Sequence, residues 1–295
     1  MVEKDEMLAQ VQMSDTLRTL CDIPHLPPLP VIAQQILEQA TDKDVDIRRL
    51  SKTIEQDPGV MARIIGLSNA AYFGQPKPIY TVQDAIVRVL GLKTVSSLAI
   101  GILLSSPFDV SKCGGFDLQR YWHVALLSAA VGRSLAPLLK DESIEPDSSY
   151  LCGLLHNIGM LVLTSCFPSE MGSAIRADHE DESSHLIEIE ERELGIDHHC
   201  AGAVIARKWH LPLDVSVVIE NHHDKDYQGE LARKVKMIGL ASRIANTMIA
   251  GDELQVETDE LGSLGIDSAA FEQVIERITE QNEDIASMSR ILAIE

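Results

Sequence analysis

The apolar run at residues 150–163 constrains the fold more strongly than any other stretch of the chain. An almost uninterrupted apolar run of this length indicates a buried helix. His156 and Asn157 stand in its middle. A buried histidine needs partners on its ring nitrogens, because an unpaired polar group in an apolar interior costs free energy. His156 is therefore either satisfied by core groups or bound to a ligand.

Helical signals extend along the rest of the chain, with no strand pattern between them. Aromatic residues make up only 4% of the sequence while Leu, Ile, Ala and Val abound, and this balance favours helices over sheets. The sequence therefore predicts an all-α fold. Capping residues such as Asp57, followed by a first-turn proline, mark helix starts, and Thr94 is expected to cap a helix. The N-terminal part is predicted to form a helix at 2–20 and then five short helices, at 30–40, 47–56, 59–71, 81–90 and 95–105.

A polar, Gly-containing stretch at 107–115 indicates a domain boundary. Further helices are predicted beyond it, among them an acidic helix whose residues 188–193 are expected to form a solvated face. The last helix, after Asp267, has an apolar stripe that could pair with another copy of the chain, although packing on its own domain is simpler. The expected organisation is an N-terminal helix at 1–25, a helical subdomain at 26–110, a helical core at 111–250 and a C-terminal helical extension at 251–295.

The charge of the chain argues against two classes of partner. Its net charge is −20, so nucleic acid and anionic membrane surfaces are repelled unless a local basic patch compensates. The apolar run at 95–104 is shorter than the roughly 20 residues that a membrane-spanning helix needs. Five cysteines occur without a Cys-x-x-Cys pair or a signal peptide, which favours a reduced, cytoplasmic setting.

The histidines form the most suggestive pattern in the sequence. His123 and His156 lie on separate predicted helices, and two histidine pairs stand at predicted helix ends, His198-His199 and His222-His223. This distribution is expected of a metal site assembled from several helices. The spacing matches neither a zinc finger nor a His-Glu-x-x-His motif. Polar residues that simply end a helix explain the pair at 222–223 equally well.

Several motifs, taken in order, resemble a known family. Trp122-His123, Leu155-His156-Asn157-Ile158-Gly159 and Asn221-His222-His223 resemble the HD superfamily of metal-dependent phosphohydrolases. The upstream motifs resemble one branch of it, the HDOD domain, an HD-related output domain of bacterial signalling proteins. These motifs are Leu26-Pro27-Pro28-Leu29-Pro30, Gln56-Asp57-Pro58, Leu67-Ser68-Asn69-Ala70-Ala71-Tyr72-Phe73-Gly74 and Asp84-Ala85-Ile86 leading to Leu90-Gly91. The resemblance covers about residues 26–250.

This resemblance implies an N-terminal five-helix subdomain packed on an HD-type helical core. In active HD enzymes a His, a His-Asp pair and a late Asp bind divalent metals that activate water for attack on phosphorus. The two histidines correspond to His123 and His156, and the two carboxylates to Asn157 and Ser242. The auxiliary histidines of the cyclic-dinucleotide-cleaving branch correspond to two further positions, namely His198 and either His222 or His223.

The departures from the HD pattern bear directly on catalysis. Hard cations such as Mg²⁺ and Mn²⁺ prefer carboxylate oxygens, whereas Asn157 and Ser242 are neutral. Two negative charges are therefore missing, and the charge of a metal would be poorly compensated. No catalytic residue is expected. A softer site for Zn²⁺, Ni²⁺ or Fe remains open, made only of histidines: His123, His156, His198 and His222.

Two functional hypotheses follow. The first is a non-catalytic output or scaffold domain of bacterial signal transduction, which works with signalling proteins and binds a protein partner or a nucleotide-like ligand. The alternative is a metal-dependent phosphohydrolase or cyclic-dinucleotide phosphodiesterase with a degenerate, histidine-rich HD site. About 25 residues precede the resemblance, so an input signal is expected from a separate chain.

Three other residues have open roles. Cys152 shares a helical face with His156, which suits a thiolate ligand or a redox thiol, but a small buried apolar side chain is the simpler interpretation. Asn69 and Tyr72, which match the HDOD signature, could bind a partner or cap a helix.

Overall fold

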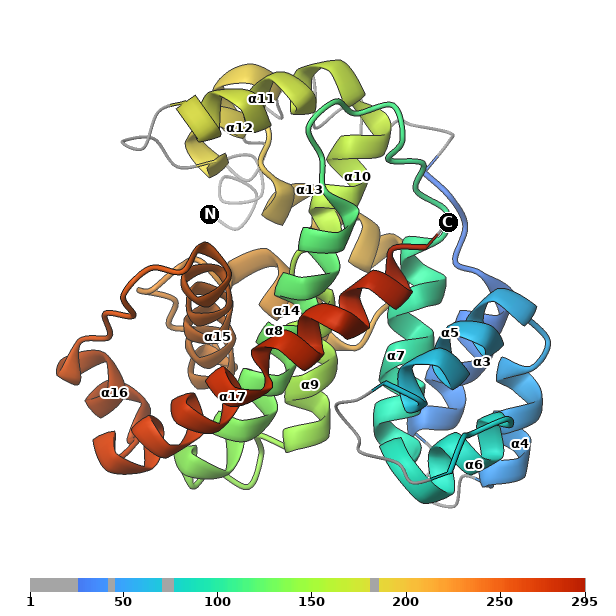
Figure 1. The fold of residues 1–295 in the computed structure, drawn as a ribbon. Coiled ribbons are helices and arrows are strands. Elements are labelled where there is room, and N and C mark those ends of the chain that lie inside the picture. The colour runs from blue at the N-terminus through green and yellow to red at the C-terminus, as the bar shows by residue number, and fades with distance from the viewer. Residues whose placement is uncertain (1–25, 42–45, 71–76, 181–185, 295) are drawn as a thin grey trace, which may run out of the picture. The chain divides into compact units, whose positions relative to one another are not determined.

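The computed structural model describes residues 26–41, 46–70, 77–180 and 186–294 (Figure 1). Every regular element in these ranges is a helix, as predicted. The predicted helix at 2–20 lies outside the described residues. The chain forms two compact units, which we describe separately. The first unit contains described residues 26–28, 108–116, 157–180 and 186–211, and the second contains 29–41, 46–70, 77–107, 117–156 and 212–294.

The N-terminal helices of the second unit begin and end close to their predicted positions. Asp57 caps its helix through a side-chain oxygen, as predicted, and Asp46 and Thr81 cap theirs in the same way. The predicted cap at Thr94 is wrong. Gly91, at φ 79°, begins that helix instead, and Thr94 is buried inside it. The elements are α3 (Val31–Thr41), α4 (Ile47–Ile54), α5 (Pro58–Ser68), α6 (Val82–Ala85), the π-helical η2 (Ile86–Leu90) and α7 (Leu92–Ser105).

Asn69 has a structural role at the end of α5. Its side-chain amide donates to the carbonyl oxygens of Ile65 and Ile79, and its Oδ1 accepts the backbone N–H of Ile79. The bond to Ile65 closes the last turn of α5, and the two bonds with Ile79 tie the helix end to the segment that leads into α6. The capping interpretation of Asn69 is therefore confirmed, whereas Tyr72 lies outside the described residues.

The helix α8 (Leu118–Leu135) lies at the centre of the second unit and packs on α9, α15 and α17. Figure 1 shows α17, in red, running along α8. Gly153 permits the close approach of α9 to α8, because a Cβ atom there would lie 2.7 Å from the Cα atom of Ala129. The N-terminal helices pack on this core through α7 on α9 and α5 on α17. The remaining helices of this unit are η3 (Ala136–Leu139), α9 (Pro146–Leu155), α14 (Leu213–Asn221), α15 (Ala232–Ala250), α16 (Thr258–Leu264) and α17 (Ser268–Leu292).

The first unit is built on two pairs of packed helices. Its helices are α10 (Ile158–Cys166), α11 (Pro168–Glu180), α12 (Leu186–Leu194) and α13 (His198–Lys208), with α10 on α13 and α11 on α12. The end of α13 holds the beginning of the described chain, because Lys208 Nζ donates to Leu26 O and Trp209 Nε1 donates to Pro27 O. A Cβ atom on Gly159 would lie 1.7 Å from the carbonyl oxygen of His198, so α10 and α13 require glycine at this position.

The apolar run at 150–163 forms two helices rather than the single buried helix that its composition predicts. Helix α9 ends at Leu155, and α10 begins at Ile158. His156 and Asn157 form the break, where the chain passes from the second unit to the first. The backbone of Asn157 (φ −99°, ψ 17°) departs from helical values, and the His156 side chain hydrogen-bonds the carbonyl oxygen of Gly153. The polar pair is therefore a helix junction.

Two apolar stretches, Leu118–Leu139 and Pro146–Cys166, are long and apolar enough to pass a composition test for a membrane span. Both are longer than the apolar run at 95–104. The fractions of these windows buried within the protein are 67% and 72%, and core helices of soluble proteins pass the same test. They are weak evidence of a span.

The four sequence ranges predicted for domains and extensions, 1–25, 26–110, 111–250 and 251–295, stay a prediction.

Candidate histidine site

His156 is almost fully buried, with 1% of its surface exposed, and both of its ring nitrogens have protein partners. Nδ1 lies 2.7 Å from the carbonyl oxygen of Gly153, and Nε2 lies 2.9 Å from Oγ of Ser242. Because a carbonyl oxygen only accepts, Nδ1 carries the proton and donates it. The lone pair of Nε2 therefore accepts the hydroxyl proton of Ser242, and a metal ion at Nε2 would need that same lone pair.

His222 completes a small cluster with His156 and Ser242 in the second unit. It caps the end of α14, and its ring centroid lies 4.8 Å from that of His156 in an edge-to-face arrangement. A close approach of α15 to His222 fixes this position, because a Cβ atom on Gly239 would lie 2.0 Å from its carbonyl oxygen. His223 is exposed, and its ring centroid lies 4.5 Å from that of His222. Of the predicted ligands, this unit brings His156 and His222 together.

His123 is half-buried on α8 and is held by the C-terminal helix. Its Nε2–H donates to Oδ1 of Asn282 on α17, at 2.9 Å. Burial lowers the pKa of His123 below its ordinary value, opposed by the Asn282 hydrogen bond and reinforced by the nearby charge of Arg120. The imidazole is therefore neutral at pH 7, and one of its nitrogens is engaged by a neutral amide.

His198 forms a buried ion pair inside the first unit. Its Nδ1 lies 2.6 Å from Oε2 of Glu190, and its backbone N–H donates to the same oxygen at 2.9 Å. Burial opposes a charged imidazole, but the Glu190 carboxylate and Asp197 outweigh it and raise the pKa of His198. The expectation of a solvated acidic face at 188–193 is wrong at Glu190, whose surface is 0% exposed. It faces inward because its neighbours Ile189 and Leu194 bury the same side of α12.

Asn157 stands at the start of α10 in the first unit and is 9% exposed. Among the described residues, no donor reaches its side-chain Oδ1. A buried amide oxygen of this kind can accept from water or bind a cation. It remains a neutral ligand where the HD pattern has a carboxylate.

The donor set does not fit a hard divalent cation. The two positions that the resemblance to HD enzymes assigns to carboxylates hold a neutral amide at Asn157 and a neutral hydroxyl at Ser242. Mg²⁺ and Mn²⁺ need anionic oxygens to offset the loss of their hydration. The imidazoles of His156 and His222 suit softer ions such as Zn²⁺, Ni²⁺ or Fe²⁺, provided that the Ser242 hydroxyl releases Nε2 of His156.

Cys152 is a buried thiol without nucleophilic character. Burial raises its pKa to about 12, assisted by the negative charge of Asp214. Asp214 is itself occupied, because Lys234 Nζ donates to its Oδ2 at 2.7 Å and Ser148 also donates to it. Cys152 therefore belongs to the core of the second unit, and the simpler of its two interpretations holds.

Two partners of the histidines, Glu190 and Asn282, are not predicted from the sequence. Glu190 looked like one member of an acidic run, and only its position beside Ile189 on α12 distinguishes it from its neighbours. Asn282 lies 159 positions from His123, so nothing local in the sequence connects the two residues.

Comparison with known proteins identifies the family of this chain. The family model described as the HDOD domain matches residues 26–225. An uncharacterized protein of Treponema pallidum (strain Nichols) is 29% identical over 214 residues, which are 71% of this chain and 39% of that protein. The chain thus spans about two fifths of the curated relative.

Two solved structures share the fold. A provisionally named signal transduction protein of Marinobacter aquaeolei VT8 has a TM-score of 0.80 at 23% identity, covering 91% of this chain and 60% of that one. A provisionally named phosphohydrolase of Shewanella amazonensis SB2B has a TM-score of 0.73 at 23% identity, covering 95% of this chain and 98% of that one. At these identities the likeness concerns the fold alone. The family match spans more than half of the sequence, so this chain belongs to the HDOD domain family.

Proposed function

We propose that this protein is a non-catalytic output or scaffold domain of signal transduction, which binds a protein partner or a nucleotide-like ligand. The observation that carries the proposal is the pairing of His156 Nε2 with the Ser242 hydroxyl at 2.9 Å. The nitrogen that would bind a metal in an active HD enzyme accepts a hydrogen bond from a neutral group. His123 is paired in a similar way with Asn282.

These pairings suit a structural role for the histidines. A hydrolytic site must hold a metal whose charge lowers the pKa of bound water, and carboxylates normally balance that charge. Here two neutral side chains, Asn157 and Ser242, stand where the carboxylates would be. The imidazoles of His123 and His156 nevertheless have protein partners, so their burial is compensated by hydrogen bonds.

The relatives are consistent with a signalling role. One structural neighbour carries a signal transduction name, and the chain itself belongs to the HDOD domain family. A net charge of −20 disfavours nucleic acid as the partner, and a reduced, cytoplasmic setting suits Cys113, Cys152 and Cys166, which form no disulfide with a described residue.

Metal analysis and turnover assays on the purified protein test the proposal. We expect no metal-dependent hydrolysis of phosphomonoesters or cyclic dinucleotides with Mg²⁺, Mn²⁺, Zn²⁺, Ni²⁺ or Fe²⁺. The matched variant is His156→Ala. Turnover that requires metal and disappears in this variant would overturn the proposal.

A second candidate is a phosphohydrolase or cyclic-dinucleotide phosphodiesterase with a degenerate, histidine-rich site. The edge-to-face contact of His156 with His222 favours it, because two adjacent imidazoles are ready ligands for a soft cation. The hydrogen bond between Nδ1 of His198 and the Glu190 carboxylate is also of the kind that orients metal-binding histidines. One structural neighbour carries a phosphohydrolase name.

Stoichiometric binding of Zn²⁺, Ni²⁺ or Fe²⁺, lost in a His156→Ala variant, would support this second candidate. A restoring experiment separates the two functions further. The double variant Asn157→Asp with Ser242→Asp adds two negative charges, and it should raise metal affinity if the ancestral site geometry survives. A wild-type protein that cannot be loaded with metal, beside a double variant that can, supports the non-catalytic proposal.

A further inference from the structure

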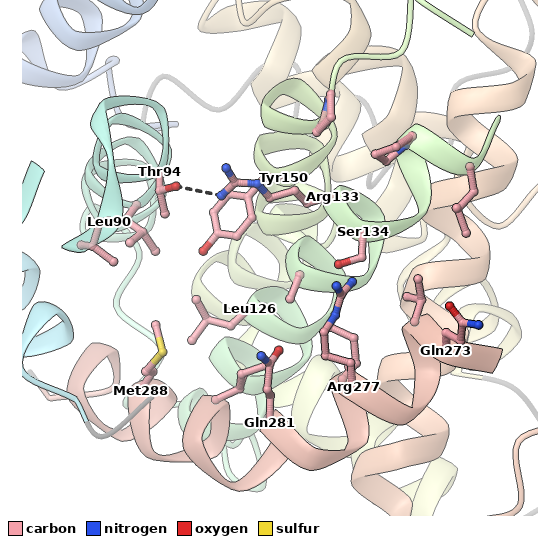
Figure 2. Close-up of a pocket in the computed structure, with 18 of the residues that line it drawn as sticks. Leu90, Thr94, Leu126, Arg133, Ser134, Tyr150, Gln273, Arg277, Gln281 and Met288 are labelled. Carbon is pink, nitrogen blue, oxygen red and sulfur yellow. Dashed lines mark hydrogen bonds between the residues drawn. The ribbon is translucent and has the colours of Figure 1, made fainter. Parts of the chain in front are cut away.

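A cavity of about 850 Å³ lies within the second unit, between α7, α8, α9 and α17, and no proposed ligand of the histidine site lines it. Small-molecule sites typically have volumes of roughly 300–1,000 Å³. Figure 2 shows Arg133 entering from α8 and Arg277 entering from α17. Buried apolar side chains of η2, α7, α8 and α17 form the rest of the wall, among them Leu90, Leu98, Leu126, Val274, Ile278 and Met288.

The charge of the cavity is opposite to that of the chain. The protein has a net charge of −20, yet the two charged side chains that line the cavity are both arginines. No described Asp or Glu is among the lining residues. Arg133 is paired with Asp147, which does not line the cavity, whereas Arg277 has no carboxylate partner in the ion pairs between described residues and is complementary to an anionic group.

Arg133 is held in place before any ligand binds. Its Nη1 donates to Oγ1 of Thr94 at 2.9 Å, its Nη2 lies 2.9 Å from a carboxylate oxygen of Asp147, and its guanidinium lies 5.9 Å from the ring centroid of Tyr150. Figure 2 shows the bond that joins it to Thr94 across the cavity. Asp147 balances the charge of Arg133, so this guanidinium is a fixed polar part of the wall.

Arg277 supplies the charge that the protein does not neutralise. None of the ion pairs between described residues includes it. It is exposed at the cavity on α17, where Gln273 and Gln281 also line the wall. The amides of glutamine provide neutral donors and acceptors for the polar groups of a ligand.

We infer that this cavity binds an amphiphilic organic anion, with a phosphate or carboxylate head on Arg277 and an apolar body between α8 and α17. This inference deepens the proposed function, because it gives the signalling module a ligand site of its own. One helix, α17, would then contact both the ligand, through Arg277, and His123, through Asn282.

Calorimetric titration tests the inference with two probes that distinguish the sources of the anion. Guanosine monophosphate presents a phosphate on a ring system, and decanoate presents a carboxylate on an aliphatic chain. We expect one of them to bind, and its identity assigns the head group. Arg277→Gln should weaken that binding about tenfold or more, because a charge-assisted hydrogen bond is lost. Ala130→Trp should abolish it, because Ala130 lines the cavity and the larger side chain fills it.

Arg290→Gln is the matched control, since it removes the same charge from an exposed position on α17 that does not line the cavity. It should bind the probe like the wild type. The inference is overturned if neither probe binds at millimolar concentration, if Arg277→Gln binds as tightly as the wild type, or if Arg290→Gln loses as much affinity. These outcomes are separate from metal-dependent turnover lost in His156→Ala, which would overturn the proposed function and leave the cavity site standing.

Discussion

Ser242 Oγ lies 2.9 Å from Nε2 of His156, so a neutral hydroxyl on α15 satisfies the buried imidazole at the junction of α9 and α10. By the resemblance to HD enzymes, Ser242 stands where a carboxylate ligand is expected. In the proposed non-catalytic module its hydroxyl instead makes a tertiary hydrogen bond to His156 that stabilises the second unit.

Ser242→Ala removes this donor and should lower the free energy of unfolding by about 1–2 kcal/mol, because a buried hydrogen bond to His156 is lost. Chemical denaturation measures the change. Ser263→Ala is the matched control. Its exposed hydroxyl bonds only the nearby carbonyl oxygen of Glu260, so the effect should stay within about 0.5 kcal/mol. Equal effects in the two variants would contradict the stabilising role of Ser242.

Asn282→Ala should lower the pKa of His123 further, because the hydrogen bond that opposes the effect of burial disappears. A titration of the His123 ring protons by NMR follows the shift. Thr279→Ala on the exposed side of α17 serves as the control and should leave the pKa unchanged. An unaltered or higher pKa in Asn282→Ala would show that α17 does not hold His123.

Glu190→Gln should destabilise the first unit by about 3–5 kcal/mol, because it breaks a buried ion pair with His198. The effect depends on pH with a definite sign. The folded-state pKa of His198 is raised above its unfolded value of about 6.5. The ion pair therefore stabilises the folded state fully below about pH 6.5, and this stabilisation is lost as pH rises through the folded-state pKa.

The difference in unfolding free energy between wild type and Glu190→Gln should therefore be largest in mildly acidic buffer and shrink in alkaline buffer. Denaturation of both proteins across this pH range provides the measurement. The exposed neighbour Glu191→Gln should show neither the loss nor the pH dependence. A difference that grows with pH would refute the assigned charge on His198.

Gly239→Ala should destabilise the second unit by about 1–3 kcal/mol or more, because the added methyl group would lie 2.0 Å from the carbonyl oxygen of His222. A Cβ atom on Gly262 of α16 would meet no atom within 4 Å, so Gly262→Ala should instead stabilise the fold by up to about 1 kcal/mol through helix propensity. Thermal unfolding distinguishes the two. Stabilisation by both substitutions would mean that α15 does not approach His222 so closely.

The helical fold could be predicted largely from local signals. Caps such as Asp57 and Asp117 act within their own turn, so the sequence near each helix start contains the information. The exceptions are positions where tertiary contacts override local preference. Thr94 resembles a cap but is buried in α7, where it accepts a hydrogen bond from Arg133. The run at 150–163 breaks after Leu155, where His156 hydrogen-bonds Gly153 in α9 and Ser242 in α15.

The candidate site was harder to predict, because its partners come from distant parts of the chain. The motifs picked out His156 and Ser242, but only the folded chain shows that one hydrogen-bonds the other across 86 positions. Glu190 and Asn282 have no sequence signature that separates them from surface residues. The cavity between α8 and α17 depends on how six elements pack, which no local pattern encodes.

Metal-dependent turnover by the wild type and His156→Ala tests the central claim most directly. Purified protein, loaded in turn with Mn²⁺, Zn²⁺ and Fe²⁺, is assayed on a phosphomonoester and on a cyclic dinucleotide. The non-catalytic account predicts no turnover above the metal-only background for either protein. Turnover by the wild type that requires the metal and is lost in His156→Ala would contradict it.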